Sequence, residues 1–309
     1  MLNIPYIDEI LYANLESKIY LGRIFIRAKI KMDELETQNI ELQLLLQAIY
    51  LKYGYDFRNY AKASIKRRIL HRLIKEKFSN ISAMQHKLLY EVSFFERLLL
   101  DMSINVTEMF RDPSFYLALK KKVVPELKKY PFLKIWHAGC STGEEVYSMA
   151  IILKEEGLYD RTQIYATDMN ELALKKAKNG IFDISRLKQY TANYQKAGGL
   201  ESFSDYYVAD DKQVIMDKSL KKNILFSDHN LATDGVFGEM NLIMCRNVLI
   251  YFNRELQNRV FKLFFDSLCT DGFLCIGSKE SIRFSESSDA FEDVVKNEKI
   301  YRRLGAATN

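Results

Sequence analysis

The spacing of apolar residues changes near residue 130, and this change divides the chain into two parts. In the first part, apolar residues recur three and four positions apart, as on one face of an amphipathic helix. Helices are predicted over 34–53, 61–78, 80–98 and 114–127. Residues 1–35 have no clean period and stay unassigned. We therefore predict an N-terminal all-helical domain with its linker over 36–112, preceded by this arm.

After residue 130, short apolar runs alternate with helical segments. Strands are predicted over 133–138, 163–167, 223–226, 241–245 and 273–276, with helices over 144–155, 171–178 and 254–268. This alternation is typical of a parallel sheet with helices on both faces. Residues 203–221 interrupt it with short Tyr, Val and Ile runs between charged turns, which indicates a small β insert. The prediction is an α/β domain over 113–309.

Composition narrows the class of protein. Of 309 residues, 48% are hydrophobic, which is enough for a sizeable core. No apolar run approaches the roughly 20 residues that span a bilayer, and the N-terminus lacks a secretory signal. We expect a cytoplasmic protein without membrane insertion. The four cysteines have no C-x-x-C spacing and the four histidines are scattered, so reduced thiols and no metal site are expected.

The net charge of +5 is mild, but basic residues gather in one short stretch. The stretch contains Lys62, Lys66, Arg67, Arg68, Arg72, Lys75 and Lys77. It predicts a local positive patch on one helix rather than a generally basic surface, so nucleic-acid binding is not expected. A solvated helix face without a partner is the alternative.

A loop with two glycines, Gly139 and Gly143, connects the first predicted strand to a helix that begins with Glu144 and Glu145. Glycine permits a sharp turn and close approach to a ligand, and the helix N-terminus offers free N–H groups. No lysine follows Gly143, as a P-loop would require, and the two acids disfavour a pyrophosphate. They suit a positively charged ligand, such as the amine or sulfonium of S-adenosylmethionine. An ordinary tight turn with acidic capping residues is the alternative.

Asp168 ends the next predicted strand, a little over twenty residues after the loop. At this place in wound α/β sheets an acid accepts hydrogen bonds from ribose hydroxyls. The same residue can also cap the following helix, and the two roles are compatible. Because Gly139 and Gly143 do not match G-x-G-x-x-G, a dinucleotide dehydrogenase is the weaker interpretation.

Two further segments place an arginine beside polar residues. Arg246 and Asn247 follow an apolar strand, with Tyr251 four residues after the asparagine, and the carboxyl end of a parallel strand faces the ligand crevice. Residues 105–113 lie between the two predicted domains, a natural place for a cleft, and contribute Arg111. Either arginine can hold a carboxylate in a planar fork. The alternatives are that Arg246 pairs with an acid at the edge of the core and that Arg111 is solvated.

Taken in order, these segments resemble a known family. The matching motifs are residues 107–112, 139–148, 166–170, 230–231 and 245–252. Together they are similar to the chemotaxis receptor glutamate methyltransferases, the CheR family, over residues 38–305. Residues 53–57 and 64–68 also resemble the helical domain of that family. Val146 stands where many members have proline, and Met109 where many have phenylalanine; both departures are conservative for packing.

The resemblance implies a fold and a set of residue roles. The expected fold is the Rossmann-like sheet of class I S-adenosylmethionine-dependent methyltransferases, with helices on both faces. The implied cofactor-binding residues are Asn105, Thr107, Arg111, Gly139, Glu144, Glu145, Asp168, Asn230, Leu231, Arg246 and Asn247. Arg111 and Tyr251 are implied as catalytic residues that orient the incoming glutamate. One of the two loop acids is implied to contact the cofactor, and Glu145 is preferred.

The implied reaction moves a methyl group from S-adenosylmethionine to glutamate side chains of chemotaxis receptors and leaves S-adenosylhomocysteine, without a metal. Lys66, Arg67, Arg68 and Arg72 are implied to dock on the acidic helical bundle of the receptor. A cytoplasmic monomer recruited to membrane-bound receptors is expected. Two alternatives stay open: a class I methyltransferase that acts on RNA or a small molecule, and a non-catalytic scaffold that only binds the cofactor.

Overall fold

The computed structural model describes residues 32–103 and 107–305. By compactness, the chain divides into a helical unit with residues 32–58 and 66–95, and a second unit with residues 59–65 and the chain from residue 96 onward. Of the arm 1–35, only residues 32–35 are described, and they belong to a helix. None of the helices in these ranges is long and apolar enough to cross a membrane.

The helical unit is built from a helix over residues 32–53 and from parts of α2 (Lys62–Lys75), α3 (Ile81–Tyr90) and α4 (Val92–Met102). One face of each helix contributes to its core, which includes Leu45, Ile49, Ile69, Met84, Leu88 and Phe94. The ring of Tyr53 stacks on that of Phe95, with 3.8 Å between the ring centroids. The single helix predicted over 80–98 is two helices, because Glu91 has extended backbone (φ −121°, ψ 104°).

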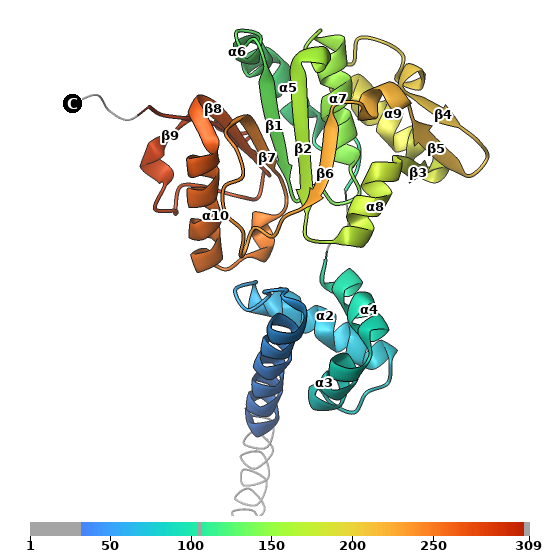
Figure 1. Cartoon of the computed structure of the whole chain (residues 1–309), viewed down its shortest axis with the longest axis vertical. Helices are drawn as coiled ribbons and strands as arrows, with labels where there is room; N and C mark the ends of the chain where they lie inside the picture. Colours follow the sequence, from blue (N-terminus) through green and yellow to red (C-terminus); the bar gives the residue numbers. More distant parts are fainter. Residues whose placement is uncertain (1–31, 104–106, 306–309) are drawn as a thin grey trace, which may run out of the picture. The chain divides into compact units, whose positions relative to one another are not determined.

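The second unit is built on a seven-stranded sheet (Figure 1). Its strands are β1 (Leu133–Ala138), β2 (Thr162–Asp168), β6 (Ile224–Asp228), β7 (Met240–Cys245), β8 (Leu268–Ile276), β9 (Phe291–Val295) and β10 (Ile300–Arg303). In the order β6-β2-β1-β7-β8-β10-β9 the first five are parallel, and β10 pairs antiparallel with both β8 and β9. From β1 the chain builds the sheet outward in one direction through β2 and β6, and then returns to add β7 and β8 on the other side of β1. Such a switch point opens a ligand crevice at the carboxyl ends of the strands.

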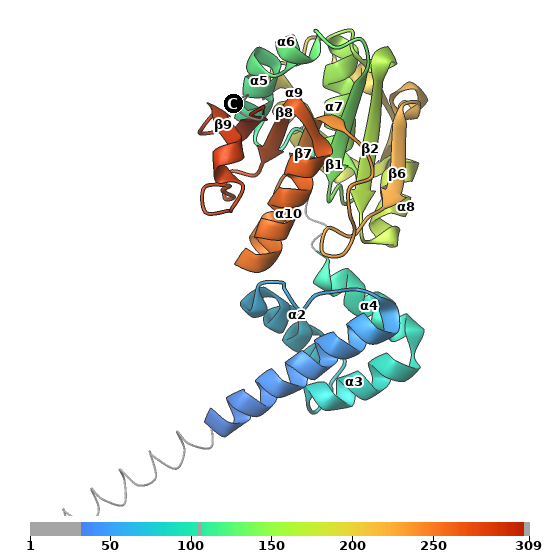
Figure 2. The same ribbon diagram turned by 60° about the vertical axis from the view of Figure 1, so that its left-hand side comes forward.

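Helices cover both faces of this sheet, so the predicted fold class is confirmed. One face packs against α5 (Pro113–Lys122), α6 (Val124–Leu127), α7 (Glu144–Glu155), α8 (Glu171–Asn179) and α9 (Leu187–Lys196). The other face packs against α10 (Arg254–Ser267), which is seen to the left of β1 and β2 in Figure 2. The neighbouring residues Ile135 and Trp136 of β1 belong to opposite clusters, as the two-residue period of a strand requires.

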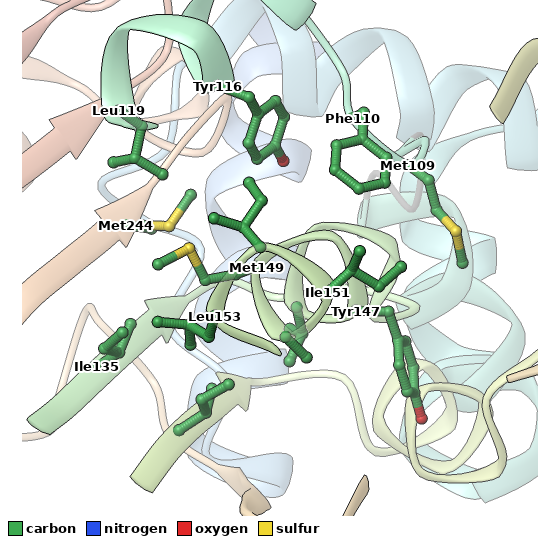
Figure 3. Close-up of a cluster of buried hydrophobic side chains, with 14 of the residues drawn as sticks. Met109, Phe110, Tyr116, Leu119, Ile135, Tyr147, Met149, Ile151, Leu153 and Met244 are labelled. Carbon is green, nitrogen blue, oxygen red and sulfur yellow. The ribbon is translucent and has the colours of Figure 1, made fainter. Parts of the chain in front are cut away.

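The segment before α5 is anchored in the core of the second unit. Figure 3 shows Phe110 and Tyr116 side by side against α7, and their ring centroids are 5.3 Å apart. The backbone N–H of Phe110 donates to Ser148 Oγ at 2.9 Å, and Met109 is fully buried. The compact division of the chain after residue 95 falls within the range 36–112 predicted for the helical domain with its linker. The anchoring also fixes Arg111 and Asp112, which follow Phe110 directly.

Two predicted segments differ in extent from the structure. The helix predicted over 114–127 ends at Lys122 and is followed by α6, since Pro125 has no N–H with which to continue the hydrogen-bond ladder. The insert predicted over 203–221 contains β4 (Tyr207–Ala209) and β5 (Gln213–Met216), but β3 (Ile181–Asp183) completes its sheet in the order β3-β5-β4. A strand of three residues is too short for its alternation to be recognised in the sequence.

Candidate functional site

The predicted cofactor loop lies at the switch point between β1 and β7. The N–H groups of Gly139 and Cys140 both donate to the carbonyl of Thr167, at 2.8 and 2.9 Å, and tie the loop to the end of β2. Gly139 has a φ of +78°, and a Cβ at this position would lie 2.6 Å from Cγ2 of Val248. Two features therefore require glycine at position 139. Its positive φ is strained for other residues, and Val248, from the loop after β7, occupies the place of a Cβ.

Asp168, at the end of β2, organises the same loop. Its Oδ2 accepts the N–H of Ser141 at 2.8 Å, and its Oδ1 accepts the N–H of Asn170 at 2.9 Å. Burial raises the pKa of Asp168, and these N–H donors oppose the rise. The cap of α8 is Asn170, whose Oδ1 accepts the N–H groups of Leu172 and Ala173. The N–H of Met169 also opposes the rise, and because a carboxylate has about four lone-pair sites, Asp168 keeps acceptor capacity for a ligand hydroxyl.

Glu144 and Glu145, the first two residues of α7, have different surroundings. Glu144 is buried, its Oε2 accepts the hydroxyl of Thr142 at 2.6 Å, and burial raises its pKa. The side chain of Glu145 is 17% exposed, with Oε1 3.0 Å from Nδ1 of His137 and Oε2 3.2 Å from Nη1 of Arg246. Burial opposes ionisation of Glu145, but its bond to His137 and the charge of Arg246 lower its pKa. Glu145 is thus the acid that is both accessible and favoured as a carboxylate.

Arg246 is buried and connects three parts of the site. Its Nη2 donates to Asp112 Oδ2 at 2.8 Å, and its Nη1 donates to Glu145 Oε2 and, at 3.3 Å, to the carbonyl of Arg111. Its side chain is 2% exposed, and its guanidinium lies 4.0 Å from the centre of the Phe115 ring. This geometry is that of an arginine paired with acids at the edge of the core. It holds the end of β7, the cofactor loop and the segment before α5 together.

The remaining predicted residues flank the same edge of the sheet. Asn247, with a φ of +62°, lies two residues after the end of β7, and Tyr251 ends the short helix η5 (Leu249–Tyr251). Asn230 and buried Leu231 follow β6, where Asn230 Oδ1 accepts the N–H of Ala232 at 3.0 Å. Because β6, β2, β1 and β7 are adjacent and parallel, all these residues lie at the same ends of neighbouring strands.

Two predicted residues belong to the segment before α5. The carbonyl of Thr107 accepts a hydrogen bond from Nη1 of Arg186 at 3.1 Å, which steadies the described start of the segment. Arg111 is half-buried, and its backbone carbonyl accepts a hydrogen bond from the guanidinium of Arg246. Asn105, predicted to contact the cofactor, lies outside the described residues.

Sequence reasoning missed two residues that hold this site. His137 is completely buried in β1 and contacts Glu145, but a histidine within an apolar strand carries no signal of its own. Glu280 follows β8, and its carboxylate accepts the N–H of Asn247 at 3.1 Å. The sequence feature that indicates Glu280 is an acid three residues after Gly277, just beyond the end of a predicted strand.

Comparison with known proteins decides the family. Residues 105–300 match the family model described as CheR methyltransferase, SAM binding domain. Residues 40–103 match the model described as CheR methyltransferase, all-alpha domain. The chain belongs to the CheR methyltransferase family.

Curated relatives of this CheR protein extend over most of its length. A relative in Pseudomonas putida, named Cher3, is 54% identical over 86% of this chain and 97% of its own length. Chemotaxis protein methyltransferases of Listeria innocua and Borreliella burgdorferi are each 31% identical. They cover 74% and 79% of this chain and 85% and 88% of their own lengths. The resemblance inferred from the motifs is thus confirmed.

The CheR chain is an S-adenosylmethionine-dependent methyltransferase, and its loop fits this cofactor. At Gly139 the missing Cβ lets Val248 pack against the loop, which fixes the loop backbone at the switch point. Glu145 offers an accessible anion for an amino group, and Asp168 offers acceptors for ribose hydroxyls. Across residues 32–103 and 107–305, no group of three or more His, Cys, Asp or Glu is suited to hold a metal ion.

Proposed function

We propose that this protein transfers the methyl group of S-adenosylmethionine to glutamate side chains of chemotaxis receptors, which forms glutamate methyl esters and S-adenosylhomocysteine. The bond from Arg246 to the carbonyl of Arg111 carries the proposal, because it holds the backbone of a second, half-buried arginine next to the guanidinium that also contacts Glu145. An arginine there suits a substrate that brings a carboxylate. The relatives named chemotaxis protein methyltransferase support the same substrate class.

The proposed chemistry needs positioning more than proton transfer. A glutamate with a pKa of about 4.3 is already ionised at neutral pH, so the site requires no strong general base. When bound, the cofactor supplies an electrophilic methyl group on its sulfonium. Arg111 and Tyr251 would orient the carboxylate toward that methyl group, and the anchored segment would exclude water. Arg111 must not bind too tightly, because the carboxylate loses its charge in the transition state.

Transfer to a receptor fragment tests this function directly. The full-length protein is incubated with methyl-labelled S-adenosylmethionine and the cytoplasmic fragment of a chemotaxis receptor. Label should enter the fragment and be released as methanol by mild alkali, as expected for an ester and not for a methylated amine. Label in RNA or a small molecule instead would favour another methyltransferase class. Cofactor binding without transfer to any acceptor would favour the scaffold alternative.

Glu145 is proposed to contact the amino group of the cofactor, and Glu144 to support the loop. Glu145→Gln should weaken S-adenosylhomocysteine binding by about tenfold or more, because a charge-assisted hydrogen bond is lost. Glu144→Gln is the matched control, with the same change one residue earlier, and its effect on affinity should be much smaller. Isothermal titration calorimetry measures both dissociation constants. A larger loss for Glu144→Gln would reverse the two assignments.

The basic residues of α2 are proposed to dock on the acidic receptor bundle, and they differ in exposure. Arg67 is exposed, whereas Lys66 and Arg68 are half-buried and Lys66 Nζ donates to Asn39 Oδ1 at 2.9 Å. Arg72 is only 5% exposed, and its Nη1 lies 3.2 Å from Oε1 of Glu76. Arg72 therefore has a structural role in α2, and Arg67 is the residue of the four best suited to a partner.

Reversing the charge of Arg67 should weaken receptor binding without a change in cofactor affinity. For Arg67→Glu we expect about a tenfold loss at low salt, which shrinks as ionic strength screens the interaction. Lys178→Glu is the control, because it reverses an exposed charge in the other unit. Surface plasmon resonance with the receptor fragment and titration with S-adenosylhomocysteine give the two affinities. Equal losses for both ligands would indicate misfolding instead of a docking surface.

A further inference from the structure

Glu280 is a buried carboxylate that the mechanism above does not use. It lies in the turn after β8, is 5% exposed, and both of its oxygens meet backbone N–H groups. Oε2 accepts from Asn247 at 3.1 Å and from Gly277 at 2.5 Å, and Oε1 accepts from Ile250 at 3.2 Å. Burial raises the pKa of Glu280, and these N–H donors oppose the rise. Only an ionised carboxylate accepts hydrogen bonds at every lone pair of both oxygens.

The loop that Glu280 holds carries two predicted site residues. Asn247 has a φ of +62° and Tyr251 ends η5, so both depend on how the backbone leaves β7. A non-glycine residue with positive φ is strained and persists only where its surroundings hold it. The N–H of Asn247 is held by Glu280, which lies in the turn after β8, the strand next to β7 in the sheet.

Gly277 makes this contact possible. A Cβ at Gly277 would lie 2.8 Å from the N atom of Asn247 and 2.8 Å from Oε2 of Glu280. Any larger residue would therefore enter the space between the carboxylate and the loop. The hydrogen bond from Asn247, after β7, to Glu280, after β8, therefore depends on Gly277 as well as on Glu280.

We propose that Glu280 is a positioning residue for methyl transfer, which fixes the backbone of residues 247–250 and thereby the places of Asn247 and Tyr251. The proposal rests on the proposed function, because the roles of these two residues do. Glu280 acts through the backbone and does not touch the substrate. A glutamine cannot replace it, because its NH₂ group would face a backbone N–H where a hydrogen-bond acceptor is needed.

A fluorine label on Tyr251 reports the loop independently of turnover. 3-Fluorotyrosine is placed at position 251 of the full-length protein, and its fluorine resonance is compared among variants. Glu280→Gln and Gly277→Ala should each shift or broaden the resonance, since one removes the acceptor and the other displaces it. Glu286→Gln is the control: this residue of the same turn is exposed and accepts from Asn258 Nδ2 at 3.3 Å. An unchanged resonance in Gly277→Ala and Glu280→Gln would overturn the proposal.

Kinetics then separate positioning from stability. Both variants should lower kcat for methylation of the receptor fragment by about 10- to 100-fold, because a displacement near 1 Å has effects of that size. The KM for the fragment should change little, since docking residues lie elsewhere. A lower Tm with normal kcat would make Glu280 merely structural. If the wild-type protein methylates no receptor fragment, the proposed function fails, whereas the fluorine comparison still decides whether Glu280 sets the loop.

Discussion

Gly139→Ala is expected to weaken S-adenosylhomocysteine binding by about 100-fold, or roughly 2.8 kcal/mol. The new Cβ would lie 2.6 Å from Cγ2 of Val248 and would occupy a backbone position with a φ of +78°. Either the cofactor loop or the loop after β7 must move, and both border the crevice at the switch point. Titration calorimetry with S-adenosylhomocysteine measures the loss.

Gly157→Ala is the matched control for this prediction. Gly157 has a φ of +70°, but a Cβ there would have no atom within 4 Å. This change therefore imposes the same backbone strain without the collision, and should lower the free energy of unfolding by about 1–2 kcal/mol with little change in affinity. If both variants lost affinity equally, backbone strain rather than the contact with Val248 would explain the effect of Gly139→Ala.

Arg246→Met is expected to lower the free energy of unfolding by about 3–5 kcal/mol. Methionine keeps much of the packing on Phe115, but Glu145 and Asp112 then lose their shared partner. An acid left without its partner in a buried place is the main source of the loss. Urea unfolding, followed by circular dichroism, gives the free energy and shows whether the slope m stays constant.

Arg283→Ala serves as the comparison for Arg246→Met. Arg283 also forms an ion pair, 3.1 Å from Asp293, but its side chain is 51% exposed. Exposed pairs contribute about 0–1 kcal/mol, so this change should be nearly neutral. Introducing Glu145→Gln into Arg246→Met should cost less than Glu145→Gln alone, since the two residues interact directly. Additive effects would contradict a coupled network.

The sequence predicted the periodic elements well and the short or irregular ones poorly. The helix predicted over 144–155 has the same bounds as α7, and four of the five parallel strands lie within two residues of their predicted ranges, whereas β8 begins five residues earlier than predicted. Long apolar repeats make such elements recognisable. The strands β9 and β10 were not predicted, because both are short; β10 pairs antiparallel with β8, and β9 pairs antiparallel with β10 at the edge of the sheet. The break at Glu91 was missed as well, since no glycine or proline marks it.

The sequence by itself determined the class of fold, the glycine loop, the acid at the end of the second strand and the family. Each depends on residue types within one short segment or on the order of such segments. Only the tertiary structure decided that Glu145 is the accessible acid, that Arg246 is buried between two acids, and that Glu280 holds Asn247. Glu145 and Arg246 are 101 residues apart in the chain. They meet because β7 lies beside β1 in the sheet, and strand order depends on packing of the whole domain, not on local pattern.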